Sequence, residues 1–448
     1  MNQPQSVQAG TLDPTFNGNG KLYFPLPEIF AAPDAVLALP DGKVLVAMGP
    51  AVSGGPITLA RLNDDGSLDR SFGPAQIGFV EVPFDTDVFI FGLILLASGG
   101  WLIVGQYVSV AESGLLVVQQ LQDGRLDASL AGDGKLYIPY DGLGAPEYAG
   151  VKQDIARRKG DKVSGGGARS SGSAGVIAVE QVDGKIVLVA NAIDASGTQR
   201  GIVLRRNYDG SPDRDFGKGG YAVVELPSVD HKFSSAKGVA VQADGQIVVC
   251  GRYVTQVGSA GGYVICFNSN GELEHQFNGG LPVIVEAPLA DLRQVTLRAS
   301  DGRIVALGNT RQGNEQNGLI VVLNKNGSYN LLFNNGQPLC SKLVPEGLDW
   351  THCGQQVDGS LVVTGTTGNR FITEDIGVIT ARYRSDGVLD TTFNPGNGFT
   401  VFNEDRGVET DKDLAVMADG RIVVCCTLWE MADPFPYIIG GIVLRYIV

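Results

Sequence analysis

The feature that most constrains the fold of this chain is a motif that returns at nearly regular intervals. Its clearest copy, Ala60–Gly73, reads ARLNDDGSLDRSFG: an apolar run, an Asp-Gly turn and a Leu-Asp-x-x-Phe corner. A half copy, Leu12–Phe16, opens the chain. Further copies follow along the chain. At the position that Phe72 holds in the clearest copy, they have Leu130, Phe216, Phe277, Phe333 and Phe393. Such self-similarity indicates stacked structural repeats, and it decides the architecture before any single residue is considered.

Each repeat contains a second turn, usually Asp-Gly, between two apolar runs. Gly accepts a positive φ and Asp tolerates the left-handed region, so Asp-Gly between such runs predicts a hairpin. The runs are continuously apolar, as in KVLVAMG (Lys43–Gly49), which is typical of strands covered on both faces. These turns lie at 41–43, 98–100, 183–185, 244–246, 301–303, 358–360 and 419–421. The sequence therefore predicts seven repeat units.

Each unit is expected to hold four antiparallel strands, which we name a to d in chain order. In the first unit they are Ala35–Pro40, Lys43–Gly49, Ile57–Asn63 and Ile77–Phe84. Seven such units with buried faces predict an all-β, seven-bladed β-propeller. The segment Gly440–Val448 reads as a strand c with no strand d after it, and residues 10–26 read as a corner and strand d with nothing before them. We therefore expect the N-terminal strand to join the C-terminal blade and close the ring.

A single propeller domain over residues 1–448 follows, with blade seven built from about 405–448 and 10–26. Blade three carries an insertion at about 144–175 that is basic and then rich in Gly and Ser, a composition typical of linkers. Its basic residues could engage an acidic partner, or the insertion is simply a solvated segment. Both interpretations stay open.

Two motifs, DGKVLVA at 41–47 and DGSLDRSFG at 65–73, are repeated together along almost the whole chain. This pairing resembles the delta-60 repeat family of bacterial propeller proteins. The resemblance implies a propeller fold and a bacterial source, and it transfers no catalytic motif. Two positions depart from the pattern: Ser98-Gly99-Gly100 replaces an Asp-Gly turn, and Leu130 replaces a corner Phe.

Members of that family are often exported, but the N-terminus MNQPQSVQAG has neither the basic nor the apolar region of a signal peptide. We therefore expect a cytoplasmic location or export without a leader. The six cysteines include no CxxC pair and are expected to be reduced, buried strand residues. No run of about eighteen apolar residues predicts a membrane span.

The net charge and the motifs of the chain disfavour several classes of ligand. The net charge of -14 disfavours nucleic acid, because the phosphates would be repelled. Three histidines, far apart in sequence, do not predict a metal site, and no cofactor motif is present. The corner acids, such as Asp69, offer oxygen ligands of the kind calcium takes, but no bidentate Glu follows. Capping of the corner amides is the simpler interpretation, with Phe72 packing between blades.

The connections divide into two faces. The a–b turns and c–d corners share one face, the turn face, and repeat closely; the b–c loops and d–a crossings share the other, the loop face, and vary. Variable loops on a rigid scaffold are where recognition is usually built, so we expect a ligand site on the loop face. The candidate binding residues there are Trp350, His352, Trp429, Arg252 and Tyr253.

A pair of titratable residues stands out among these positions. His352 and Asp413 both lie six residues before the Asp of an a–b turn, in neighbouring blades. Such a pair could perform acid–base chemistry, orient a ligand, or make a structural contact between blades. The aromatic and basic residues Trp429, Arg252 and Tyr253 could form a stacking surface.

The leading hypothesis is a monomeric, non-enzymatic propeller that binds a glycan, peptide or protein partner on the loop face. One alternative is a hydrolase or lyase that acts at the central funnel through His352 and Asp413. Another is a structural subunit of a bacterial assembly or toxin. Since propellers host all of these functions, the fold alone cannot choose among them.

Overall fold

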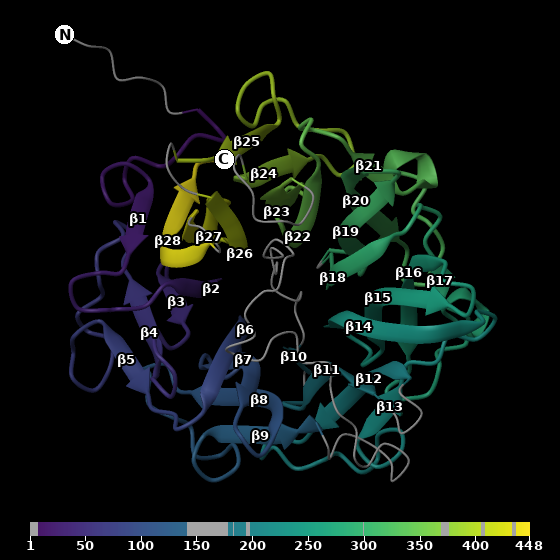
Figure 1. Cartoon of the computed structure of the whole chain (residues 1–448), viewed down its shortest axis with the longest axis horizontal. Coiled ribbons are helices and arrows are strands. Elements are labelled where there is room, and N and C mark those ends of the chain that lie inside the picture. The colour runs from purple at the N-terminus through teal and green to yellow at the C-terminus, as the bar shows by residue number, and fades with distance from the viewer. Residues whose placement is uncertain are drawn as a thin grey trace.

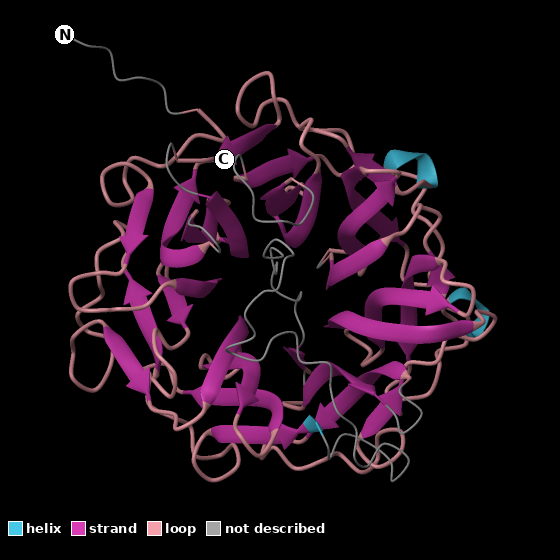
Figure 2. Ribbon diagram, in the orientation of Figure 1, coloured by secondary structure: helices cyan, strands magenta, loops and turns pink. Residues whose placement is uncertain are grey.

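The computed structural model describes residues 8–140, 178–181, 183–193, 198–298, 300–368, 376–404, 408–431 and 436–448. Its strands form seven four-stranded antiparallel sheets around a central axis (Figure 1). The predicted all-β, seven-bladed propeller is therefore confirmed. Within the described residues, helix is confined to short 3-10 turns such as η3 (Asn278–Gly280) and η4 (Asn334–Gly336) at the rim (Figure 2). The predicted insertion at 144–175 lies outside the described residues.

The blades follow one another along the chain. Blade one contains β2 (Pro33–Ala38), β3 (Val44–Met48), β4 (Ile57–Leu62) and β5 (Phe79–Val82). Blade two contains β6 (Asp87–Leu95), β7 (Trp101–Val108), β8 (Ser113–Gln120) and β9 (Lys135–Pro139). Blade three contains β10 (Ala178–Glu180), β11 (Ile186–Ile193), β12 (Gln199–Arg206) and β13 (Tyr221–Val223). Blade four contains β14 (His231–Val241), β15 (Ile247–Thr255), β16 (Ala260–Phe267) and β17 (Val283–Ile284).

The last three blades continue this order until the ring closes. Blade five contains β18 (Asp291–Leu297), β19 (Ile304–Gln312), β20 (Glu315–Leu323) and β21 (Leu339–Ser341). Blade six contains β22 (Leu348–Gln355), β23 (Leu361–Thr367), β24 (Val378–Tyr383) and β25 (Phe399–Phe402). Blade seven contains β26 (Val408–Val416), β27 (Ile422–Glu430), β28 (Tyr437–Tyr446) and, from the other end of the chain, β1 (Lys21–Phe24).

The ring is closed by the pairing of β1 with β28, in which Lys21 lies opposite Leu444. The two ends of the chain also rebuild the c–d corner of blade seven. Gly10 donates its backbone N–H to Ile447 at 2.7 Å, as Gly66 does to Asn63 in blade one. Gly10 has a φ of +80°, so a residue with a side chain would be strained there. The two chain ends thus reproduce a local structure that the other blades form with continuous chain.

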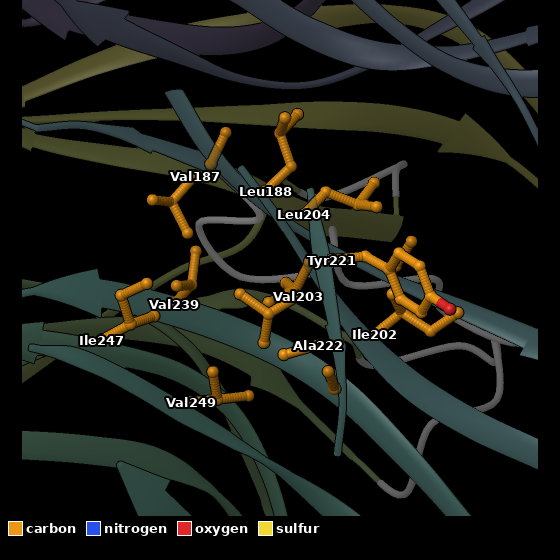
Figure 3. Packing of buried hydrophobic residues seen from close by; sticks show 14 of the residues in the cluster. Val187, Leu188, Ile202, Val203, Leu204, Tyr221, Ala222, Val239, Ile247 and Val249 are labelled. Carbon is orange, nitrogen blue, oxygen red and sulfur yellow. The ribbon is translucent and has the colours of Figure 1, made fainter. Parts of the chain in front are cut away.

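Buried aliphatic side chains fill the seams between blades. Strand b is covered on both sides, and in β3 every residue is buried. Figure 3 shows the seam between blades three and four, where residues of both blades pack together: Val187, Val203, Val239, Ile247 and Val249. None of the described helices is long and apolar enough to cross a membrane.

A polar interlock on the turn face fastens each of three blades to the next. In blade one, Arg61 donates from Nε to Asp69 at 2.7 Å and lies over the ring of Phe72, 4.6 Å from its centroid. The same guanidinium donates to the backbone carbonyl of Gln122 in blade two at 3.2 Å. Arg205 in blade three and Arg445 in blade seven repeat this arrangement.

The corner aspartates accept bonds from backbone amides as well as from these cations. Asp69 Oδ1 accepts from the amide of Ser71 at 3.1 Å, and Phe72 is fully buried. The interpretation of the corner as a capped turn with a packed Phe is confirmed. Its carboxylate oxygen Oδ2 is shared by Arg61 and Lys43, at 2.7 Å from each.

The interlock of blade seven joins the two ends of the chain. Arg445 is fully buried and donates from Nε to Asp13 at 2.8 Å, while Arg421 donates to the same carboxylate at 3.2 Å. Burial alone would raise the pKa of Asp13, but hydrogen bonds from Thr15 and the charge of Arg445 lower it. The charged form of Asp13 therefore stabilises the closed ring.

Replacing Asp13 by Ala should lower the free energy of unfolding by about 3 kcal/mol, because the buried Arg445 loses its charged partner. Urea denaturation followed by tryptophan fluorescence measures the change. The matched control is Asp127→Ala, whose corner partner is the neutral Gln119 at 2.9 Å. We expect that control to cost about 1 kcal/mol. Equal losses in the two variants would contradict a special role of Asp13 in closure.

Candidate functional site

Strand a is the innermost strand of every blade (Figure 1). In the six blades other than blade three, it carries a β-bulge at a nearly constant position. A bulge inserts one unpaired residue and redirects its side chain. The extra residue lies seven positions before the first residue of the a–b turn in most of these blades. In blade five it lies eight positions before it. The inserted residues are Asp34, Phe91, Lys237, Arg293, Thr351 and Lys412.

Side chains at and near these bulges bond across four consecutive seams, from blade four round to blade one. We call this set the inner belt. Lys237 donates to Asp291 at 2.5 Å, and Arg293 donates to Asp349 at 2.7 Å. Thr351 donates to Asp411, and Lys412 donates to Asp34 at 3.2 Å. The inner belt therefore joins successive blades near the axis, as the interlock does at the corners.

His352 belongs to the inner belt, but its partner differs from the predicted one. Its Nδ1 lies 3.0 Å from Oδ2 of Asp411, two residues before Asp413. Asp413 instead accepts from the backbone amide of Val36 at 3.0 Å and from that of Leu414 at 2.8 Å. The difference arises from the bulge at Lys412, which places the two carboxylates in different seams.

The protonation states of these groups follow from burial and charge. Burial alone would lower the pKa of His352, but the hydrogen bond to Asp411 and its charge raise it. Burial alone would raise the pKa of Asp411, but the bond to His352 and its charge lower it. Both shifts favour the charged forms, so the pair is an imidazolium and a carboxylate at any pH below the raised pKa of His352. For Asp413, burial raises the pKa to about 6.

This geometry gives the His352–Asp411 pair a structural role. Asp411 is fully buried and also accepts from Thr366 at 2.8 Å. A protonated imidazole cannot act as a general base, and a ligand cannot reach a fully buried carboxylate without parting the blades. The chemistry that the pair supports best is the fastening of blade six to blade seven.

The remaining predicted binding residues do not form one surface. Trp350 is fully buried, beside Gly318 of blade five. Trp429 is half-buried in blade seven and donates from Nε1 to Thr410 at 2.9 Å. Arg252 and Tyr253 are half-buried in β15 of blade four, which lies across the ring from β27 (Figure 1). The structure therefore does not bring Trp429 together with these two residues.

Sequence reasoning missed Asp411 and most of the inner belt. The signal was present, because the charged residues stand at a nearly fixed offset before each a–b turn. Comparison of that offset across repeats shows cations in blades four, five and seven, at Lys237, Arg293 and Lys412. The bulge itself, which decides which seam each side chain enters, has no such signal.

The cysteines and acids offer no evident metal centre. Cys340 is exposed in β21, which corrects the expectation that every cysteine is buried; the other five are buried. Within the described ranges, no three or more His, Cys, Asp or Glu side chains are placed to hold a metal ion.

The loop face carries several exposed apolar side chains. Val52, Val110 and Val257 lie at the b–c loops of blades one, two and four, and all three are largely exposed. Phe30, in the crossing from blade seven to blade one, is 76% exposed. The start of β28 adds Tyr437, Ile438 and Ile439, each about half exposed. The turn face also carries exposed apolar side chains, such as Leu331, Leu332 and Val357, so apolar exposure alone does not single out the loop face.

The charge of His352 generates a pH-dependent prediction. Because its pKa is raised in the folded protein, the pair stabilises the fold fully below the unfolded value of about 6.5. That stabilisation is lost as the pH rises through the folded-state pKa. We expect His352→Gln to lose less stability than the wild type between pH 6.5 and 8.5, measured by urea denaturation. His275→Gln, at an exposed corner residue, is the control, and an identical pH profile in all three proteins would refute the ion pair.

Comparisons with known proteins agree with the fold. Four segments, 39–72, 181–216, 242–277 and 356–393, match the family model described as "Domain of unknown function (DUF5122) beta-propeller". They cover the a–b turn to the corner of blades one, three, four and six. The chain matches none of the curated proteins with which it was compared.

Solved structures show only a general likeness. An ulvan lyase, which is a polysaccharide lyase, is 11% identical with a TM-score of 0.42, over 91% of this chain and 95% of that one. AofleA from Arthrobotrys oligospora is 14% identical with a TM-score of 0.38, over 90% and 95%. Trypanosoma rangeli sialidase is 8% identical with a TM-score of 0.35, over 100% and 59%. Identities and TM-scores as low as these say nothing about the activity of this chain. The four matched segments are similar to the repeats of that β-propeller family.

Proposed function

We propose that this protein is a non-enzymatic propeller that binds a peptide or protein partner on its loop face, and that its repeats are of the delta-60 type. The observation that carries the binding role is the edge of β28 that no described strand covers, which lies among exposed apolar side chains on that face. Most of them are aliphatic, whereas carbohydrates are commonly held by aromatic rings. Among the partners that the sequence leaves open, a polypeptide therefore fits better than a glycan.

The best-defined part of this surface lies on blade seven. The start of β28, Tyr437–Gly440, is paired with β27 on one side. On the other side β1 begins its pairing only at Gly441, so no described strand covers the outer edge of Tyr437–Gly440. An uncovered strand edge offers backbone donors and acceptors to an extended peptide. Phe30 lies three residues before Pro33, which packs against Gly441, so it borders the same region.

The physical driving force is the removal of apolar surface from water. Burial of such surface contributes about 25 cal/mol per Å². Ile439 is the residue left unpaired at a register shift between β27 and β28, Ile438 is next to it, and both are exposed. A peptide added beside β28 would cover at least one of them while it pairs with the backbone.

The alternative functions have weaker support. The hydrolase or lyase alternative needs an accessible acid–base pair, and His352 is instead held as a buried ion pair with Asp411. We also propose that the protein acts as a monomer, because a net charge of -14 makes two copies repel each other.

A peptide-library screen, run beside a glycan array on the full chain, tests the proposed function. We expect peptide ligands, and we expect Ile438→Asp together with Phe30→Ser to weaken their binding at least about tenfold by loss of apolar contact. The matched control is Leu331→Asp with Leu332→Ser, a pair of similarly exposed apolar residues on the turn face. Binding that survives the first variant, or that is lost equally in the control, would overturn the assignment. Glycan binding alone would reject the partner class.

A further inference from the structure

The corner of blade five departs from the interlock that fastens blades one, three and seven to their neighbours. In blade one the amide of Asp69 donates to the carbonyl of Arg61, and in blade five the amide of Asn330 donates to the carbonyl of Val322 in the same way. Val322 therefore occupies the position of the arginine, and Asn330 that of the aspartate. The corner of blade five has lost both charged members of the interlock.

The lost guanidinium leaves a pocket in the seam between blades five and six, on the turn face. Val322 and Phe333 line it from blade five, where in blade one Arg61 covers the equivalent Phe72. Ser385 lines it from blade six, at the position whose carbonyl receives the arginine in blades one, three and seven. The pocket has a volume of about 20 Å³ and opens to solvent, enough for a group of about the size of a water molecule.

Cationic side chains surround this pocket. Arg298 and Arg303 line it from blade five and Arg384 from blade six. Arg298 and Arg303 share the single carboxylate of Asp301, with Arg303 Nε 3.0 Å from its Oδ2. Arg384 lies 3.6 Å from Asp386, a long contact at the surface. Three guanidinium groups thus face two carboxylates, which leaves one positive charge in excess.

Two further observations show that polar groups lining the pocket lack the partners that their equivalents have. The residue equivalent to Arg303 in blade one, Lys43, is bonded to the corner Asp69, whereas the corner of blade five presents the neutral Asn330. Gln355 also lines the pocket, and its buried Nε2 and Oε1 have no hydrogen-bond partner. Buried polar atoms without partners are costly, so a ligand that bonds them is stabilised.

We propose that this pocket binds an oxyanion, a carboxylate or phosphate group, between Arg303 and Arg384, with Gln355 Nε2 as a further donor. Guanidinium groups match such oxygens in charge and in donor geometry. A cation would be repelled by the three arginines, and a purely apolar group would leave Gln355 unsatisfied. The volume admits about one oxygen atom of the head group, so the rest of the ligand would extend over the apolar wall formed by Val322 and Phe333 or into solvent.

The first experiment measures thermal unfolding of the full chain in inorganic phosphate, acetate or chloride at equal ionic strength. A ligand that binds only the folded state raises the unfolding midpoint. We expect phosphate or acetate, but not chloride, to raise it, and the stronger of the two identifies the preferred head group. The same midpoint in all three salts would overturn the proposal.

Variants locate the anion. Arg384→Gln should weaken binding about tenfold, because one charged hydrogen-bond donor is lost. The control is Arg125→Gln, since Arg125 is similarly exposed and pairs with Asp123 across the same two-residue separation, in blade two. The combined change Val322→Arg with Asn330→Asp should refill the pocket, restore the interlock and abolish the response to the anion.

The outcomes are distinguishable. A response that persists in both Arg384→Gln and the refilled protein would place the anion elsewhere and reject the site. A response lost in Arg125→Gln as well would indicate a general effect of charge, which also rejects it. Should the refilled protein fail to fold, the comparison of Arg384→Gln with Arg125→Gln still decides. None of these results depends on the loop face, so they test the pocket separately from the proposed function.

Discussion

In blades one, three and seven, the guanidinium of a strand c arginine is the contact that fastens one blade to the next. In one residue it bonds the corner carboxylate, covers the corner Phe and reaches the backbone of the next blade. Each of these contacts is modest, but they share one side chain that is already ordered by burial. At blade seven the same contact, made by Arg445, holds residues from opposite ends of the chain. The ring is therefore closed by the same arginine contact that joins blades one and two.

The inner belt complements the interlock near the axis. At each seam a donor of one blade meets a carboxylate of the next, as Lys237 meets Asp291 and Arg293 meets Asp349. Because each pair spans a seam, the belt specifies which blade edges meet, while the apolar core supplies the general attraction. Its concentration in blades four to seven and blade one breaks the symmetry of the repeat. The histidine that first suggests catalysis is part of this scaffold.

Departures from the repeat mark where function can be added. Blade seven lets β28 extend beyond β1, which uncovers a strand edge among exposed apolar residues. Blade five replaces the interlock arginine with Val322, which opens a small pocket among cations. The first lies on the loop face and the second on the turn face. The apolar core and the inner belt still hold the blades together, so the fold can tolerate both the uncovered edge of β28 and the missing arginine of blade five.

The sequence alone determined the repeat, the four strands of each unit, the number of blades and the closure of the ring. These follow from local turn chemistry and strand burial, which are read from neighbouring residues. The tertiary structure decided which side chains meet across seams. It paired His352 with Asp411 rather than Asp413, separated Trp429 from Arg252 and Tyr253, and revealed the pocket beside Val322. A bulge of one residue, and the absence of one guanidinium, act on neighbours about sixty residues away. Such contacts depend on how blades stack, and no pattern within a single repeat specifies them.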